Sequence, residues 1–224
     1  MTPTVQSTEP IRFYFDYISP YSYIAWTQLD ALAARHGRRA EPIAVLFAAL
    51  LNANGQKGPA EIPSKRAYIF KDVLRKAHRL GVPFSMPPTH PFNPLLALRV
   101  SSLPMADELR RSIVDAFFKA TWAGGEGIED PVAVARLLRA NGLDGEGLVA
   151  EAAGGDTKAR LRRQTDEALG LGAFGVPTIV ADGELFWGYD AFDVIDDHLG
   201  GRGPREPELL DRWANLKASA SRVR

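Results

Sequence analysis

Strand-like segments occur near the two ends of this chain, and a long stretch of helical periodicity separates them. Residues 11–17 (IRFYFDY) are rich in β-branched and aromatic side chains and predict a strand. A helix is predicted to begin at Ser19-Pro20, because serine is a favoured N-cap and proline a favoured first helical residue, and Gly37 can end it. Residues 39–47 predict a second strand. Two strands joined by a helix form a parallel pair with a right-handed crossover.

The middle of the chain has a different pattern. Residues 52–64 are rich in glycine, proline and asparagine and predict a loop. From Ser64 to about Leu169 the apolar residues recur at helical spacing, with a proline-rich loop over residues 82–94. Asp130-Pro131 repeats the cap-then-proline signal and predicts the start of one of these helices.

The strand pattern returns near the end of the chain, at residues 178–181. Asp182-Gly183 follows, which is the strongest short hairpin signal, and residues 185–187 predict the second strand of the hairpin. A closing helix is predicted from about residue 190 to 199.

The predicted order is therefore strand–helix–strand, a helical block, and strand–strand–helix. A helical insertion that splits a small mixed sheet is the architecture of an α/β protein with a thioredoxin-like fold and a large inserted all-helical domain, although the order alone does not select that fold. The expected parts are a split thioredoxin-like domain of residues 11–50 and 171–200, an inserted helical domain of residues 51–170, and a C-terminal helical extension of residues 201–224.

The composition excludes several classes of protein. The 224 residues are 46% hydrophobic, with 27 basic and 27 acidic side chains, and this zero net charge argues against a nucleic acid partner. The N-terminus lacks the apolar core of a signal peptide, and the longest apolar run, residues 43–51, is half of a membrane span. We therefore expect a soluble, cytoplasmic protein without a membrane partner.

The chain contains no cysteine, which restricts its chemistry. It can form no disulfide and no cysteine metal site, and it has no thiol of its own for redox work. The four histidines show no mutual spacing that suggests a metal, so no metal site is expected.

Ser19 stands where a predicted strand ends and a predicted helix begins. The simpler interpretation is a helix cap, in which the hydroxyl accepts a hydrogen bond from a backbone N–H of the helix. In the functional interpretation this helix start holds an anion, because free N–H groups and the helix dipole stabilise a negative charge by up to about 2 kcal/mol. A thiolate held there would have its pKa lowered from about 8.5 to about 7. Because the chain has no cysteine, that thiol would come from a ligand.

Val176-Pro177 precedes the predicted hairpin. A rigid loop that enters a strand is the simpler interpretation. The sharper one is a cis-proline, which would leave the backbone of Val176 at the sheet edge, where an extended peptide ligand can pair with it as an added strand. Glutathione is such a peptide, and it carries a thiol.

Four segments carry a resemblance to a known family. They are FYFDYISPYSY near the start, the loop at residues 55–59, IPSKRAY at 62–68 and GAFGVPTIV…FWGYD at 172–190. Over about residues 11–200 the chain resembles the 2-hydroxychromene-2-carboxylate isomerases, which are relatives of kappa-class glutathione transferases. Both groups resemble bacterial disulfide-forming oxidoreductases of thioredoxin fold with the redox cysteines lost. The resemblance implies glutathione as cofactor, a small aromatic or unsaturated acid as substrate, and a homodimer.

The resemblance also implies roles for single residues. Ser19 would hold the glutathione sulfur as a thiolate, and Val176, before Pro177, would pair with the cysteinyl backbone. Asp190 would meet the γ-glutamyl ammonium, and the backbone N–H of Tyr189 the γ-glutamyl carboxylate.

Two further glutathione-binding positions are implied, one of them near the glycyl end. Lys65 resembles a lysine of the family there, and Gln56 stands where the family often has asparagine. The residue at Tyr189 is commonly serine or asparagine in the family, so Gln56 and Tyr189 bear on substrate choice and glutathione affinity. Without the resemblance, Asp190 would be interpreted as a helix cap and Lys65 as a solvated side chain.

A substrate pocket is predicted more weakly. Tyr21, Phe92 and Trp187 are candidates for an aromatic wall, and Asn93 for a contact with a substrate carboxylate or hydroxyl. Five further aromatic residues fit such a wall, namely Tyr17, Tyr23, Trp26, Phe47 and Phe174. Most of these eight aromatic side chains are nevertheless expected in the core.

The predicted function is a glutathione-dependent cis–trans isomerase that acts on 2-hydroxychromene-2-carboxylate or a similar aromatic unsaturated ketoacid. One alternative is a kappa-like glutathione transferase or peroxidase. Another is a non-catalytic thioredoxin-fold module that binds peptides or acts as a chaperone. An isomerase consumes no glutathione, which distinguishes it from a transferase.

Overall fold

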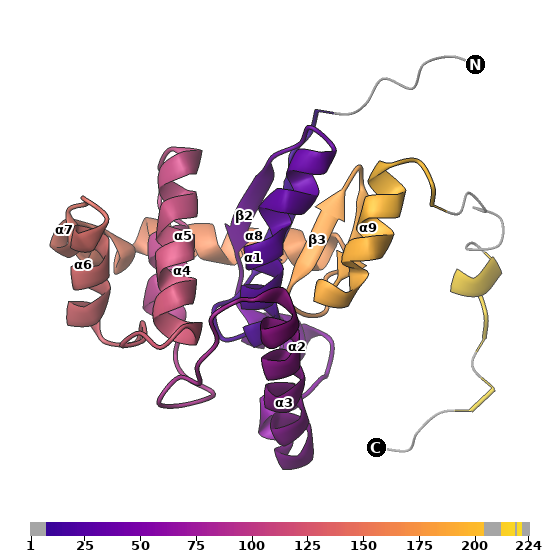
Figure 1. Cartoon of the computed structure of the whole chain (residues 1–224), viewed down its shortest axis with the longest axis horizontal. Helices are drawn as coiled ribbons and strands as arrows, with labels where there is room; N and C mark the ends of the chain where they lie inside the picture. Colours follow the sequence, from indigo (N-terminus) through magenta and orange to yellow (C-terminus); the bar gives the residue numbers. More distant parts are fainter. Residues whose placement is uncertain (1–7, 204–211, 218, 221–224) are drawn as a thin grey trace.

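The structure is a computed structural model that describes residues 8–203, 212–217 and 219–220 (Figure 1). Within these residues the strands form a four-stranded mixed sheet of order β2-β1-β3-β4. β1 runs parallel to β2 and antiparallel to β3, and β3 runs antiparallel to β4. The strands are β1 (Ile11–Phe15), β2 (Ala40–Ala44), β3 (Thr178–Ala181) and β4 (Glu184–Trp187). In register, Ile11 lies opposite Ala40, and Phe13 lies opposite Ile179.

The first helix, α1 (Pro20–Arg35), connects β1 to β2 as predicted. The Ser19 side chain accepts the N–H of Ser22 and caps this helix. After the last turn the chain passes through Gly37 with φ +63°, a left-handed conformation that favours glycine. The predicted strand–helix–strand unit is therefore confirmed.

The second predicted strand, residues 39–47, was too long. β2 ends at Ala44, and Phe47 begins α2 (Phe47–Ala53). The physical reason is that side chains distant in sequence take over the backbone donors that a strand would use. The Phe47 N–H donates to the Asp16 carboxylate, and the Leu46 N–H donates to the Thr165 hydroxyl, both at 3.0 Å.

Helices occupy most of the chain between β2 and β3. The predicted loop of residues 52–64 is shorter than expected, because α2 extends into it and α3 begins before its end. The proline-rich loop of residues 82–94 is confirmed. The remaining elements of this segment are η1 (Pro59–Glu61), α3 (Pro63–Leu80), α4 (Leu95–Ser101), α5 (Asp107–Trp122), α6 (Pro131–Ala140), α7 (Gly145–Ala152) and α8 (Gly155–Gly170).

The predicted hairpin between β3 and β4 is confirmed. Its two turn residues, Asp182 and Gly183, have φ values of 51° and 84°, and the left-handed pair matches the twist of the strands. The closing helix begins slightly later than predicted, as α9 (Phe192–Leu199), after a short 3₁₀ turn, η2 (Tyr189–Ala191).

The two faces of the sheet have separate cores. Phe13, Phe15 and Ile179 pack with residues of α1, α5 and α9 on one face. Tyr14 and Val180 point to the other face and pack with residues of α2 and α8. This alternation follows the two-residue period of a strand. The strands β1, β2 and β3 are therefore buried on both sides, whereas β4 forms a more exposed edge.

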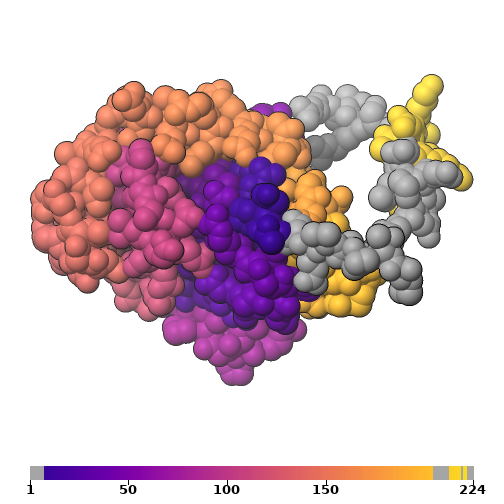
Figure 2. Space-filling view, turned by 90° about the horizontal axis from the view of Figure 1, so that it is seen from above, coloured from indigo at the N-terminus to yellow at the C-terminus, as the bar shows by residue number. Residues whose placement is uncertain are grey.

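Segments distant in sequence surround the N-terminal unit. In Figure 1, α4 to α7 lie on one side of α1 and β2, whereas β3 and α9 lie on the other, and α3 projects below them. Figure 2 shows the same order from above, with the N-terminal segment (indigo) between the helical segment (pink to orange) and the C-terminal unit. The predicted mixed sheet with a helical insertion, a thioredoxin-like fold, is confirmed.

The chain end is described only in part. Of the extension predicted over residues 201–224, the structure describes 201–203, 212–217 and 219–220, and residues 212–214 have helical backbone; the rest of this prediction lies outside the described residues. Across the described part of the chain, no helix combines the length and the apolar character needed to cross a bilayer.

Candidate active site

Ser19 lies at the point where β1 ends and α1 begins, and its side chain is buried. Its hydroxyl accepts the Ser22 N–H at 3.1 Å and donates to the Val176 carbonyl at 3.5 Å. The helix cap predicted for Ser19 is therefore present. The second bond brings Ser19 and Val176, which are 157 residues apart in sequence, to the same place.

Val176 and Pro177 are joined by a cis peptide bond, as predicted. The carbonyl of Pro177 accepts the Gly188 N–H at 2.9 Å, which ties this turn to the start of η2. Gly175 lies directly beneath the indole of Trp187, because a Cβ at Gly175 would be 2.7 Å from Trp187 Nε1. The close approach of this indole explains why glycine stands at that position.

A cavity of ≈ 680 Å³ opens beside Ser19 and Val176. Its wall is formed by the turn before α1, by α2, by the loop and helix from Gln56 to Phe70, by the loop of residues 90–95 and by residues 174–176 with Trp187. Eight of the predicted site residues line it: Ser19, Tyr21, Gln56, Lys65, Phe92, Asn93, Val176 and Trp187. Pro177, Tyr189 and Asp190 do not line it.

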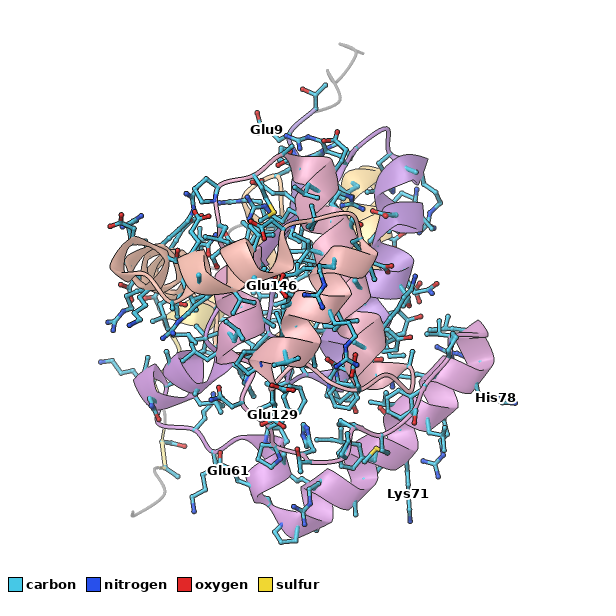
Figure 3. The ribbon with its side chains drawn as sticks, turned by 90° about the vertical axis from the view of Figure 1, so that its left-hand side faces the viewer. Glu9, Glu61, Lys71, His78, Glu129 and Glu146 are labelled. Carbon is cyan, nitrogen blue, oxygen red and sulfur yellow. The ribbon has the colours of Figure 1, made fainter. Side chains whose placement is uncertain are left out.

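The acidic side chains of the cavity wall are hydrogen-bonded, whereas its basic side chains have no ion-pair partner among the described residues. Its acidic side chains are held by backbone donors: Glu61, labelled in Figure 3, accepts the Gly58 N–H, and Asp16 accepts two N–H groups. Three cations line the same cavity and have no ion-pair partner among the described residues; they are Lys57, Lys65 and Arg66. The cavity is therefore mostly apolar with a cationic wall, which suits a small organic anion.

Asp16 is a residue of the site that the sequence reasoning missed. It is only 3% exposed, and its carboxylate accepts the N–H groups of Ile18 and Phe47. Burial raises the pKa of Asp16 to about 6, because its effect is larger than that of the two hydrogen bonds, which lower the pKa. The signal available in the sequence was an acidic residue inside an otherwise apolar strand pattern.

Asp190 lies outside the cavity but is linked to it. Its carboxylate meets Lys76 Nζ at 3.3 Å, and Lys76 also meets Asp72 at 2.8 Å. Tyr21, in the cavity wall, donates its hydroxyl to Asp72 at 2.7 Å. Asp190 remains 78% exposed at its side chain, so an ammonium group can still approach it. Tyr189 is half-buried and packs on the ring of Phe192 at 5.1 Å.

Asn93 has a structural role in the loop before α4. Its Oδ1 accepts the Leu95 N–H at 3.1 Å, and its own N–H donates to Glu129 at 2.9 Å. Glu129, labelled in Figure 3, also accepts the Thr89 hydroxyl at 3.0 Å. Asn93 therefore faces the cavity from a loop whose conformation is held on both sides.

Fewer of the eight aromatic candidates belong to the core than the sequence reasoning expected, because five of them line the cavity: Tyr21, Phe47, Phe92, Phe174 and Trp187. Tyr17, Tyr23 and Trp26 are buried core residues. His90 also lines the cavity, which the sequence did not indicate. Within the described residues, no group of three or more histidine or acidic side chains is arranged to hold a metal ion.

Comparison with known proteins places this geometry in a family. The model of the DSBA-like thioredoxin domain matches residues 10–200. The chain is 29% identical over 198 residues to a 2-hydroxychromene-2-carboxylate isomerase of Sphingobium xenophagum, covering 86% of this chain and 98% of that protein. It is 28% identical over 211 residues to glutathione S-transferase kappa 2 of Caenorhabditis elegans, covering 84% and 91%.

A solved structure of a 2-hydroxychromene-2-carboxylate isomerase has a similar fold. It superposes with a TM-score of 0.79 at 24% identity and covers 94% of this chain and 100% of that one. The resemblance to these isomerases and to the kappa-class transferases is confirmed. The match of the family model over residues 10–200 shows that this chain belongs to the family of DSBA-like thioredoxin domains.

Proposed function

We propose that this protein is a glutathione-dependent cis–trans isomerase that acts on 2-hydroxychromene-2-carboxylate or a similar aromatic unsaturated ketoacid. The observation that carries the proposal is the position of Ser19. Its hydroxyl, at the start of α1, lies against the Val176 carbonyl in the wall of a largely apolar cavity. Three cationic side chains also line this cavity, and they have no ion-pair partner among the described residues. The relatives named for this isomerisation support the same activity.

The residues around Ser19 fit glutathione. A thiolate would lie at the positive end of the α1 dipole, beside the Ser19 hydroxyl. Val176 belongs to a turn that already meets Ser19, so a peptide that pairs with Val176 would bring its thiol to that hydroxyl. Lys65 would contact the glycyl end and Gln56 another part of glutathione. The exposed carboxylate of Asp190, with the backbone N–H of Tyr189, would bind the γ-glutamyl group.

Bound glutathione would supply the thiol that adds to the activated double bond of the substrate, so that the bond can rotate before the thiol leaves. The chain itself would hold that thiol deprotonated through Ser19 and the start of α1. Its aromatic side chains, Phe92 and Trp187 among them, would enclose the substrate ring and exclude water. Since the chain has no cysteine, its own side chains supply no competing thiol.

A kappa-like glutathione transferase is the second candidate, and the similarity to a kappa-class enzyme over most of this chain favours it. Product analysis separates the two activities. An isomerase returns all the glutathione added, whereas a transferase converts glutathione and an aryl halide to a conjugate. Stoichiometric loss of free thiol during turnover would identify the transferase.

The glutathione site is tested by calorimetric titration of glutathione into the wild-type protein and two variants. We expect Asp190→Ala to weaken binding about tenfold, because a charge-assisted hydrogen bond to the γ-glutamyl ammonium is lost. Asp193→Ala removes a nearby exposed carboxylate and should leave the affinity unchanged. Absence of both heat and thermal stabilisation at millimolar glutathione would refute the proposed function.

We propose that residues 11–50 and 171–200 form the thioredoxin-like domain and 51–170 the inserted helical domain, in a cytoplasmic homodimer. Light scattering coupled to size-exclusion chromatography measures the assembly, and cell fractionation measures the location.

A further inference from the structure

His90 is a polar residue in the aromatic part of the cavity wall. Its imidazole packs edge-to-face on Phe70 with ring centroids 5.2 Å apart, and on Trp122 at 5.6 Å. The ring of Phe92 lies on a third side at 6.0 Å. An imidazole enclosed in this way is fixed in orientation, and it still lines the cavity.

One nitrogen of this imidazole lacks a partner. His90 Nδ1 is buried and has no hydrogen-bond partner in the described part of the protein. An unpaired N–H costs more free energy to bury than an unpaired lone pair, so the tautomer with an unprotonated Nδ1 is favoured. The proton then resides on Nε2, which is the nitrogen left to meet a molecule in the cavity. His90 is thereby arranged as a hydrogen-bond donor.

Arg66 supplies a positive charge beside this donor. It lies one turn before Phe70 on α3, so the two side chains share a helix face, and Phe70 contacts His90. Burial, and next the charge of Arg66, lower the pKa of His90 to about 4. The imidazole is therefore neutral near pH 7, and Arg66 carries the charge. No carboxylate forms an ion pair with Arg66 within the described residues.

The loop that carries His90 is anchored on both sides. Glu129 accepts the hydroxyl of Thr89, the residue before His90, and the N–H of Asn93. Asn93 in turn accepts the N–H of Leu95 at the start of α4. A donor held on an anchored loop loses little conformational entropy when it binds a ligand.

We propose that Arg66 and His90 form a subsite that binds the carboxylate of an aromatic or unsaturated acid, with Arg66 supplying the charge and His90 Nε2–H a hydrogen bond. The inference names the substrate-binding residues of the proposed isomerase, and in that respect it rests on the proposed function. The subsite belongs to the same cavity as Ser19, so an acid bound there would share the cavity with the thiol.

The chemistry of the cavity favours this class of ligand. Its volume of ≈ 680 Å³ falls within the range of small-molecule sites, and Phe70 and Phe92 line it together with Arg66 and His90. A planar ring would bury apolar surface against those side chains, and an anionic group would in addition form a charge-assisted hydrogen bond with Arg66. A compact acid without a ring would satisfy the charge but leave the aromatic wall uncovered.

The test is a calorimetric titration of the full-length protein with 2-hydroxycinnamate and, separately, with its methyl ester. We expect Arg66→Gln and His90→Phe each to weaken binding of the acid about tenfold, because each removes one charge-assisted hydrogen bond. His90→Phe keeps the aromatic packing of the site. Arg79→Gln removes an exposed arginine from the same helix, outside the cavity, and should have no effect. The ester should bind more weakly than the acid and should be insensitive to Arg66→Gln.

Glutathione is titrated into the same variants to separate this inference from the proposed function. Unchanged glutathione affinity in Arg66→Gln and His90→Phe, with weakened acid binding, supports the subsite and shows that both variants are folded. If the wild type binds acid and ester equally, or binds no acid, the subsite is refuted even where glutathione binds. If the acid binds through Arg66 and His90 but glutathione does not bind at all, the subsite stands and the isomerase is refuted.

Discussion

Ser19 combines two roles that different measurements can separate. Its hydroxyl caps α1 through the Ser22 N–H, and it also faces the cavity beside Val176. Loss of a helix cap costs about 1 kcal/mol of folding free energy, whatever the function of the protein. Loss of an interaction with a thiolate would change the pKa of a bound thiol. Stability and thiol pKa therefore report on different roles of one side chain.

Ser19→Ala is expected to lower isomerase activity by about tenfold or more and to raise the pKa of bound glutathione, because a charge-assisted hydrogen bond to the sulfur is lost. The measurements are initial rates and the ultraviolet absorbance of the thiolate as a function of pH. Asp130→Ala is the matched control, since Asp130 caps α6 through the Val132 N–H at 3.1 Å, outside the cavity. The two variants should lose similar stability, and only Ser19→Ala should lose activity. Equal activities would remove Ser19 from the mechanism.

Asp16 should make stability depend on pH. Burial raises the pKa of Asp16 from the ordinary 3.8 to about 6 in the folded protein. Between these two values the folded protein keeps a proton that the unfolded chain has released. The contribution of Asp16 is therefore complete below pH 3.8 and is lost as the pH rises through about 6, a decrease of about 3 kcal/mol.

Asp16→Asn removes the titrating group. Urea unfolding at about pH 4 and at about pH 7 measures the free energy of unfolding of the wild type and of this variant. We expect the free energy of unfolding of the wild type, minus that of Asp16→Asn, to be larger at the lower pH. Asp144→Asn, which makes the same substitution at an exposed carboxylate that caps α7, is the matched variant for the loss of a carboxylate. A difference of opposite sign would mean that Asp16 is charged at low pH.

At the scale of elements, the loop between α3 and α4 forms the part of the cavity wall that contains His90, Phe92 and Asn93. It contains no helix or strand, so side chains must fix its conformation. Glu129 does this through Thr89 and the backbone of Asn93, from the segment that precedes α6. The shape of the cavity thus depends on contacts between two irregular segments.

Glu129→Ala is expected to raise the KM for the aromatic substrate several-fold, because the loop loses two hydrogen bonds worth about 1 kcal/mol each. Glutathione affinity should remain that of the wild type. Glu126→Ala, three residues earlier, removes an exposed ion pair with Arg136 and should change neither constant. Steady-state kinetics with varied substrate provide the measurement; a loss of kcat at constant KM would contradict a positioning role.

For the molecule as a whole, the helical segment and the sheet share one core. Phe118 of α5 packs on Phe15 at 5.4 Å and on Tyr17 at 4.8 Å, and its side chain is fully buried. Trp122, from the same helix, donates its indole N–H to the Tyr17 carbonyl at 2.8 Å. Separate unfolding of the two parts would expose this cluster.

Phe118→Ala should therefore destabilise the whole protein by about 3 to 5 kcal/mol through the cavity that it leaves. We expect one transition, shifted equally in the far-ultraviolet and near-ultraviolet circular dichroism signals. Two separated transitions in the wild type would show that the helical segment folds independently of the sheet.

The accurate sequence predictions all rest on local signals. Ser19-Pro20 predicted the start of α1, and Asp182-Gly183 predicted the hairpin, because a cap and a turn are determined by a few adjacent residues. The cis bond at Val176-Pro177 and the family resemblance were likewise read from short motifs. These signals sufficed to predict the order of elements and the thioredoxin-like fold, and eight of the residues that they singled out line one cavity.

The tertiary structure decided what depends on contacts between distant residues. Phe47 begins a helix rather than continuing a strand because the carboxylate of Asp16, 31 residues earlier, accepts its N–H. Tyr189 and Asp190 lie beside the cavity rather than in its wall. His90 faces the cavity because Phe70 and Trp122 enclose its ring.

By itself, the sequence determined where α1 begins, where the β3–β4 hairpin turns, which family the chain resembles and that any reactive thiol must come from a ligand. Only the tertiary structure decided that Asp16 is buried and that Arg66 and His90 share one cavity with Ser19. The physical reason is that burial, electrostatic potential and cavity shape arise from segments that meet only after folding.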